Sequence, residues 1–314
     1  MPQNINYAPI ISLISQARIS SYSTTFRTNT NAELFGVYTW SQHVSGALFP
    51  LIQGLEITIR NAIDVEARRR FGDFWWDTIG CRRRVSSTNF YSNIDKAEQK
   101  LTRSWEKLER TRLNLRRNAP IPTQIPSWTH DQIVAATDFS TWHFILNKEF
   151  SAPNNTQANS YLWPSSMGRA FRNYNTFSSN VNNARTNLVN AIFELREYRN
   201  RIFHHEPIWT KAPGTNNPQL AIDSIREKIN KIEKLINSVD RRKLTAMEKV
   251  GLFSNVRRIC STQELDIYMY RQSDAQMTKR QKRIMRKKSS LAQNENKTLS
   301  WEHNGCLFGM NRIR

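Results

Sequence analysis

Apolar residues recur along most of the chain at the spacing of an α-helix, three or four positions apart. The series in residues 222–236 is the most regular, with an isoleucine at each turn. No stretch of alternating apolar and polar residues persists, so the sequence does not predict strands. Helices are predicted around residues 44–70, 101–115, 181–204 and 222–236. This pattern predicts an all-α protein, most simply a helical bundle with additional helices.

Short polar signals indicate where helices begin and where connections separate them. Gln132 follows Thr129 by three residues, which is the spacing of a capping box at a helix start. Ser261 and Glu264 repeat that spacing further along the chain. Proline-rich or polar composition predicts non-helical connections at residues 119–126, 151–160 and 211–219.

Composition places the chain among globular proteins. Apolar residues make up 39% of its 314 residues, and the most apolar stretch, residues 47–59, is too short to span a bilayer. The N-terminus lacks the basic and apolar regions of a signal peptide. The three cysteines are widely spaced, which argues against a disulfide scaffold and a thiolate zinc site. We therefore expect a soluble, cytoplasmic protein that binds neither membrane nor metal.

The charge balance points to a polyanionic partner. The chain has 46 Lys and Arg residues against 26 Asp and Glu, a formal net charge of +20. The excess is +8 in residues 270–314 and +7 in residues 60–118. Because each phosphate neutralised by Lys or Arg releases counterions, nucleic acid is the first candidate. The predicted RNA-binding residues form two basic clusters: Arg82, Arg83 and Arg84, and Lys279, Arg280, Lys282, Arg283, Arg286, Lys287 and Lys288.

Aromatic side chains are interleaved with the first basic segment. They can stack on bases or ribose, or they can turn into the hydrophobic core. For any single tryptophan the core is the expected place, since large aromatic residues are highly buried on average. The four residues concerned are Trp75, Trp76, Tyr91 and Trp105.

Residues 194–209 carry the side chains best suited to chemistry, and the sequence contains no established metal-binding or phosphate-cradling motif. Arg199 falls on the apolar stripe of its predicted helix, where a guanidinium must be paired or must face a cleft or an interface. His204 and His205 follow near the helix end. The alternative is purely structural: Glu56 neutralises Arg199, and the two histidines cap free carbonyls.

The order of four sequence blocks adds to this interpretation. The most specific block is Arg199-Asn-Arg-Ile-Phe-His-His-Glu-Pro-Ile-Trp209, preceded upstream by Leu55-Glu-Ile-Thr-Ile-Arg-Asn61. On these blocks the chain resembles the Abi-like (abortive infection) family of bacterial proteins, whose members belong to the HEPN superfamily of helical nucleic-acid-handling domains. The resemblance rests on residues 38–40, 47–63 with 71–76, 129–135 with 162–163, and 199–209.

This resemblance implies a domain plan, a site and an assembly. The expected plan is a HEPN-like core in residues 1–210, a C-terminal helical extension in residues 211–270 and a basic tail in residues 271–314. In HEPN ribonucleases an Arg-x(4–6)-His motif is the catalytic signature, and two such motifs meet across a dimer to form one cleft. Carried over to this sequence, the predicted catalytic residues are Arg199, Asn200, His204 and, in reserve, His205.

The implied activity is that of a metal-independent RNA endonuclease, the toxin of an anti-phage abortive-infection system. RNA supplies its own nucleophile, so a histidine that moves protons and an arginine that stabilises the charged phosphorane suffice without a cofactor. Attack by the 2′-OH leaves a 2′,3′-cyclic phosphate and a 5′-OH. The expected partners are RNA, including a small noncoding RNA that restrains the protein as in toxin–antitoxin pairs, and a second copy of the chain. The alternative is a non-cleaving RNA-binding protein that forms a ribonucleoprotein.

Overall fold

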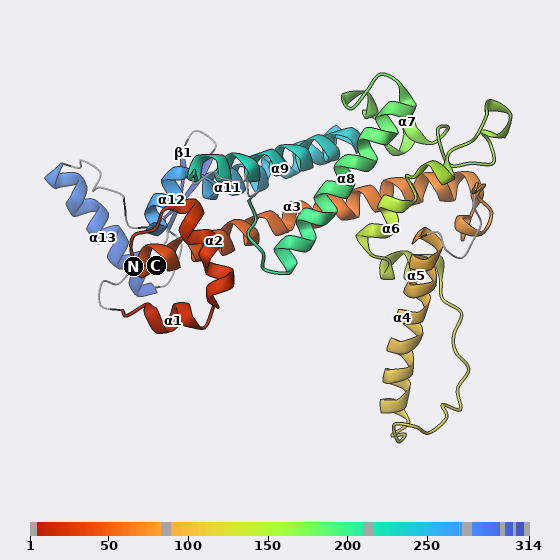
Figure 1. The fold of residues 1–314 in the computed structure, drawn as a ribbon, viewed down its shortest axis with the longest axis horizontal. Coiled ribbons are helices and arrows are strands. Elements are labelled where there is room, and N and C mark those ends of the chain that lie inside the picture. Colours follow the sequence, from red (N-terminus) through yellow and green to blue (C-terminus); the bar gives the residue numbers. More distant parts are fainter. Residues whose placement is uncertain are drawn as a thin grey trace.

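One helix of 41 residues, α3 (Asn31–Phe71), runs through the computed structural model, and most other elements lie along it (Figure 1). The structure describes residues 5–82, 89–209, 217–269, 271, 278–295, 299–303 and 306–310. Three further helices of 22 to 24 residues are α4 (Asn89–Arg112), α8 (Val181–Phe203) and α9 (Pro218–Val239).

Shorter elements precede α3, connect the long helices and end the chain. The short α-helices are α1 (Ala8–Ser12), α2 (Gln16–Phe26), α5 (His130–Ala136), α6 (Phe139–Phe144), α7 (Met167–Ala170), α10 (Arg241–Lys249), α11 (Leu252–Ile259) and α12 (Thr262–Met269). Single 3-10 turns occur at η1 (Trp75–Asp77), η2 (Lys148–Phe150), η3 (Asn155–Gln157) and η4 (Tyr174–Thr176). The C-terminal elements are α13 (Lys279–Glu295), β1 (Leu299–His303) and β2 (Cys306–Met310).

Local signals explain the length of α3. Thr30 caps its start by accepting a hydrogen bond of 3.1 Å from the backbone N–H of Glu33. It ends at Gly72, whose φ of +83° favours a residue without Cβ. Pro50 lies inside the helix, where it removes one backbone N–H without ending the helix. The stripe predicted in residues 44–70 is buried, with Leu48, Ile52, Leu55 and Ile59 at most 4% exposed.

The hydrophobic core is continuous across α3, α8 and α9. α9 packs against both of the other helices, and α11 and α12 pack along α3. The isoleucine stripe of α9 is fully buried, so the predicted helices at 181–204 and 222–236 are confirmed. Residues 218–269 therefore complete the core of the preceding segment, and the domain boundary at residue 210 stays a sequence-based prediction.

The predicted helix starts and connections are also confirmed where the structure describes them. Thr129 and Gln132 form the capping box of α5, and Ser261 accepts the Glu264 N–H at 3.2 Å before α12. Residues 119–126 are non-helical, and residues 151–160 contain only η3. The connection predicted at 211–219 lies largely outside the described residues, and α9 begins at Pro218.

The helix predicted at 101–115 is the second half of α4, which projects from the body as an arm (Figure 1). Its buried apolar residues lie in the first half, at Phe90, Ile94 and Ala97, where α4 packs against α5 and α6. Leu108, on the predicted stripe, is 70% exposed. The spacing of apolar residues predicted the helix correctly, but the arm has no neighbour to cover the whole stripe.

The basic tail contains regular structure that the sequence pattern did not predict. Lys279–Glu295 is helical, because Lys, Arg, Gln, Met, Leu and Ala all favour helices. The following strands β1 and β2 form an antiparallel hairpin in which Leu299 pairs with Met310 and His303 with Cys306. The expectation of no strands was therefore wrong for these ten residues. Asn304-Gly305, a strong hairpin signal, stands between the two strands in the sequence.

Candidate functional site

The candidate site lies where α8 ends. Two backbone hydrogen bonds close this end as a Schellman motif: the His205 N–H donates to the Ile202 carbonyl at 3.1 Å, and the Glu206 N–H donates to the Arg201 carbonyl at 2.9 Å. His205 has a φ of +56°, in the left-handed region where this motif usually has glycine. Pro207 follows, so the helix cannot continue. The helix therefore ends at the two histidines, as their place near the helix end in the sequence indicated.

Arg201 and Trp209 hold the chain that follows the helix. The Arg201 guanidinium donates to the carbonyls of Pro207 and Trp209, and its Nε lies 3.5 Å from a carboxylate oxygen of Glu206. The Trp209 ring is 1% exposed and meets the rings of Tyr22 and Phe26 of α2 edge to face, with centroids 4.8 Å and 5.0 Å away. These contacts fix the turn and leave both histidines exposed.

Arg199 is half-buried one turn before the histidines. The buried side of α8 passes through Leu195 and Tyr198, so Arg199 lies at the edge of the apolar stripe. Its guanidinium stacks 4.4 Å from the ring centroid of Phe203, and its Nη1 donates to Asn200 Oδ1 at 3.3 Å. Most of its five N–H donors therefore stay available to a phosphate.

Glu56 of α3 lies near Arg199 but does not form a close ion pair with it. No nitrogen of Arg199 comes within 4.0 Å of a carboxylate oxygen in the described part of the chain. Burial raises the pKa of Glu56, while the cations of Arg199 and Arg60 act in the opposite direction. The purely structural alternative, in which Glu56 fully neutralises Arg199, is thus weaker than the sequence suggested.

The other histidines whose side chains are described are buried or hydrogen-bonded at other places in the fold. His43 is hydrogen-bonded to the Tyr268 hydroxyl, and His130 is buried with its Nε2 3.0 Å from Asp64 Oδ1. His143 is buried too, and burial, aided by the Arg196 cation, lowers its pKa to about 4. Among the histidines whose side chains are described, only those at the end of α8 are exposed and make no side-chain hydrogen bond.

A cavity of about 380 Å³ opens beside His205. Its walls come from α2, from the first half of α3 and from the end of α8. His205 and Glu206 line it, whereas His204 does not. The structure thus places the two histidines differently: His204 caps the helix at the surface, and His205 faces a cavity. Which of them is catalytic remains a matter of prediction.

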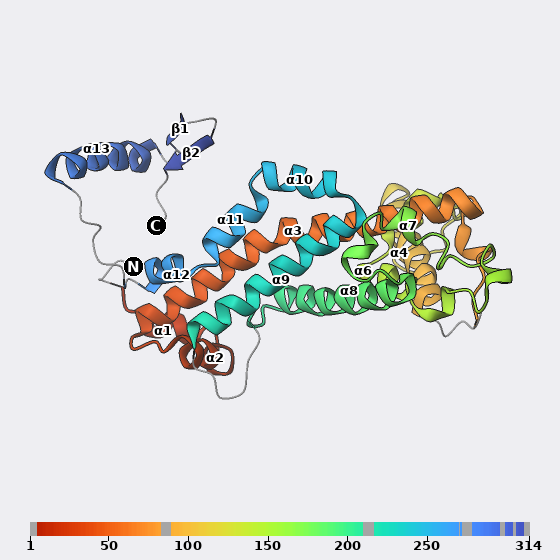
Figure 2. The same cartoon turned by 90° about the horizontal axis from the view of Figure 1, so that it is seen from above.

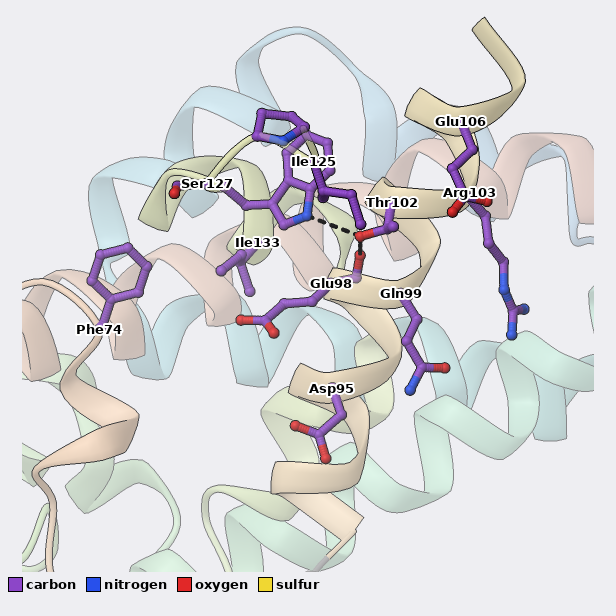
Figure 3. Close-up of a pocket in the computed structure, with 12 residues that line it drawn as sticks. Phe74, Asp95, Glu98, Gln99, Thr102, Arg103, Glu106, Ile125, Ser127 and Ile133 are labelled. Atoms are coloured by element: carbon purple, nitrogen blue, oxygen red, sulfur yellow. Dashed lines mark hydrogen bonds between the residues drawn. The ribbon is translucent and has the colours of Figure 1, made fainter. Parts of the chain in front are cut away.

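A second cavity, of about 740 Å³, lies beside α4 and is lined by several carboxylates (Figure 3). Asp95, Glu98 and Glu106 line it together with a single cation, Arg103. Burial and the neighbouring carboxylates raise the pKa of Glu98. Trp128, which donates to Thr102 Oγ1 at 3.2 Å, closes one side. The carboxylates make this cavity a poor site for a polyanion.

The predicted RNA-binding residues fall in three situations. Arg82 is exposed, but its guanidinium already donates to the carbonyls of Ser151 and Ala152, at 3.0 Å and 3.1 Å. Arg83 and Arg84 lie outside the described residues. The seven cations of α13 are all exposed: Lys279, Arg280, Lys282, Arg283, Arg286, Lys287 and Lys288.

The aromatic residues interleaved with the first basic segment were expected either in the core or accessible to bases and ribose, and they differ in this respect. Trp75 and Trp76 are at most 3% exposed and belong to the core, as expected for single tryptophans. Tyr91 and Trp105 are half-buried on α4. Sequence reasoning missed a different aromatic pair, Phe49 and Phe203, whose exposed rings meet 5.7 Å apart beside Arg199. Their separation by more than 150 positions left no local signal.

Among the described residues, no group of three His, Cys, Asp or Glu side chains is arranged to hold a metal ion. None of the described helices combines the length and the apolar composition that a transmembrane span requires.

Comparison with known proteins agrees with the sequence blocks that carry the resemblance. Residues 4–210, which include α2, α3, α8 and both histidines, match the family described as Abi-like protein. Comparison with curated proteins and with solved structures finds no match. Since the family match covers about two thirds of the 314 residues, the chain belongs to the Abi-like protein family, which associates it with abortive infection.

Proposed function

We propose that the chain is a metal-independent RNA endonuclease acting in abortive infection. The observation that carries the proposal is the grouping at the end of α8: a stacked arginine and two exposed imidazoles within seven residues, in a chain of net charge +20. The resemblance of the same segment to the HEPN ribonuclease signature supports this activity.

The proposed reaction is a transphosphorylation. The 2′-oxygen of RNA loses its proton to one imidazole and attacks the adjacent phosphorus. The bond from phosphorus to the 5′-oxygen breaks, and that oxygen takes up a proton from the second imidazole. The products are a 2′,3′-cyclic phosphate and a 5′-OH. Arg199 stabilises the phosphorane because its guanidinium offers a planar pair of donors to two phosphoryl oxygens. Asn200, which accepts from Arg199, orients the guanidinium.

The active form is proposed to be a two-fold dimer. The exposed rings of Phe49 and Phe203 lie against each other beside Arg199, and a second copy covers them. Two sites then meet across the interface. A small noncoding RNA that separates or blocks these sites would restrain the protein.

Purified protein and end-labelled single-stranded RNA test this activity. Arg199→Ala is expected to lower the cleavage rate about 10²–10⁴-fold, because a group acting only in the transition state is lost. RNA affinity is expected to change little, since many other cations hold the phosphates. Cleavage should persist in EDTA, fail on DNA and on 2′-O-methyl RNA, and leave cyclic phosphate ends.

Arg196→Ala is the matched control. Arg196 is also a half-buried arginine of α8 stacked on aromatic rings, but it is ion-paired with Glu197 at 2.9 Å. The control should retain cleavage. If Arg199→Ala cleaves RNA as fast as Arg196→Ala, the nuclease proposal is wrong.

The second candidate is a non-cleaving RNA-binding protein. The seven exposed cations of α13 favour it, because they contribute affinity without any catalytic geometry. Under this alternative, the wild type binds RNA tightly and leaves it intact in the same assay.

A further inference from the structure

We propose that the cavity beside His205 is a nucleobase pocket. It holds the base of the nucleotide next to the scissile phosphate and favours bases that carry an exocyclic amino group. This inference rests on the proposed nuclease function and adds a sequence preference to it. It concerns the cavity of about 380 Å³, within the size range of small-molecule sites.

Aromatic and polar groups converge on this cavity. Tyr38 of α3 provides a ring surface on which a base can stack. Phe49, whose exposed side the proposed second copy covers, contributes a further apolar part of the lining. Gln42, also on the wall, offers both a donor and an acceptor to the edge of a base. In the described part of the chain, the side chains of Gln42 and His205 make no hydrogen bond, so both can bind a ligand.

A backbone acceptor adds to this set. In α3, the carbonyl of Gly46 would normally accept from the N–H four residues later, but that residue is Pro50, which has none. Gly46 is among the residues that line the cavity, and from this we infer that its carbonyl, which lacks its helical donor, is accessible to a ligand there. Glu206, on the opposite wall, can only accept when ionised.

The balance of donors and acceptors sets the preference. The Gly46 carbonyl lacks its helical donor, and the Glu206 carboxylate, which Arg201 approaches at one oxygen, has a second oxygen that can accept from the ligand. Adenine, cytosine and guanine carry an exocyclic amino group with two N–H donors. Uracil has carbonyl oxygens in place of an amino group and a single N–H on its pairing edge, so it satisfies at most one of the two acceptors. We therefore expect few cuts in RNA where uridine occupies the position, next to the cut, whose base enters the cavity.

Gly46 also provides a direct way to close the cavity. A Cβ added at Gly46 meets no atom within 4 Å, and the glycine is in a helix, where leucine is a better helix former. Gly46→Leu is therefore expected to fold at least as well as the wild type while filling the space for the base. Gly168→Leu is the matched control, since its nearest neighbour lies 4.0 Å from the added Cβ and it does not line this cavity.

The experiment maps cleavage sites in a pool of random-sequence RNA for the wild type and both leucine variants. The wild type should show depletion of uridine at one position next to the cut. Gly46→Leu should lose that preference and cleave at least about tenfold more slowly than the wild type, because one base can no longer stack in the cavity. Gly168→Leu should keep the preference and the rate. An unchanged preference in Gly46→Leu, or no preference in the wild type, overturns the proposal.

Pro50→Ala tests the backbone acceptor without touching the cavity wall. It supplies the missing N–H to Gly46, so the discrimination against uridine should shrink while the cavity stays open. Light scattering on Gly46→Leu tests whether a second copy, and not a base, fills the cavity. If this variant is monomeric where the wild type is a dimer, the cavity holds a segment of the second copy and the proposal is wrong.

Failure of the nuclease function is distinguishable from failure of the pocket. If the wild type does not cleave RNA at all, titration with AMP, CMP and UMP followed by NMR still tests the cavity. Saturable binding of AMP and CMP that Gly46→Leu abolishes supports a base pocket in a non-cleaving protein. Absence of binding to the wild type, or equal binding to both proteins, overturns it.

Discussion

His205 adopts a left-handed backbone conformation that glycine would adopt at lower cost. For a residue with a Cβ, this conformation costs roughly 1–2 kcal/mol, and such strain concentrates at functional sites. The neighbouring contacts of Arg201 and Trp209 hold the strained turn in place. A glycine at this position would complete the same Schellman motif, so the imidazole is not needed for the turn.

The backbone strain at His205 and the chemistry of its imidazole can therefore be measured separately in one variant. His205→Gly should raise the free energy of unfolding by about 1 kcal/mol because it relieves the strain at φ +56°. The same variant should lower cleavage about 10²–10⁴-fold if the imidazole transfers a proton. Urea unfolding and a cleavage time course measure the two effects.

His204→Gly is the comparison, since His204 has a φ of −86° and glycine there brings no relief. It should lower the stability by up to about 1 kcal/mol. Full cleavage by His205→Gly together with loss of cleavage by His204→Gly would assign the catalytic role to His204.

At the scale of elements, two helices present exposed cations away from the core. α13 carries the seven already named, and α4 carries a stripe of Lys96, Lys100, Arg103 and Lys107 at helical spacing. Figure 2 shows that α13 reaches beyond the core, and Figure 1 shows the same for α4. Arg271 does not belong with them: it is ion-paired with Glu33 at 3.0 Å and ties the start of α3 to the end of the core.

We predict that each helix contributes separately to the salt dependence of RNA affinity. Replacing the seven cations of α13 with glutamine, which keeps helix propensity, should weaken binding and flatten the slope of log K against log salt. For single-stranded RNA, the slope should fall by about 0.7 for every phosphate that is no longer neutralised. Filter binding between 50 and 300 mM salt (roughly the range in which such slopes are measured) provides the data.

Replacing the four cations of the α4 stripe with glutamine should flatten the salt slope less than the α13 variant does. The two changes should add when both helices are altered. An unchanged slope for the α13 variant would show that this helix is not in contact with RNA. Any truncation must keep Arg271, because its loss removes a structural ion pair. A drop in RNA affinity could then come from lower stability of the fold and not from lost RNA contacts.

At the scale of the whole molecule, the proposed site is open on one side. Phe203 is 46% exposed and Phe49 is 44% exposed, and their rings lie against each other beside Arg199. Exposed aromatic rings grouped around a candidate site, together with stacked guanidinium groups, are typical of interfaces. The fold therefore leaves a surface that a second copy is expected to cover.

The corresponding prediction concerns assembly. Phe203→Glu should convert the dimer to a monomer and abolish cleavage, because a carboxylate is buried in the interface. Light scattering and activity at matched concentrations measure both. Val250→Glu is the control, since Val250 is 72% exposed and lies on the turn after α10. A wild type that is monomeric with full activity would contradict the composite site.

The sequence by itself determined the long helices, two of the helix starts and the presence of an arginine–histidine motif. Local backbone preferences and the periodicity of apolar residues are properties of short segments, so α3, α8 and α9 could be predicted with nothing else known. The resemblance of ordered blocks to the Abi-like family was equally readable, and it is confirmed over residues 4–210.

Only the tertiary structure decided what covers each helical face. Periodicity shows which residues share a face, but not whether a neighbour lies against it, and so Leu108 is exposed on an arm while Trp75 is buried. The same limit applies to the site. Gly46 and His205 are 159 positions apart in sequence and share one cavity because the turn after α8 folds back against α3, an arrangement that depends on the packing of Trp209 and on no local pattern.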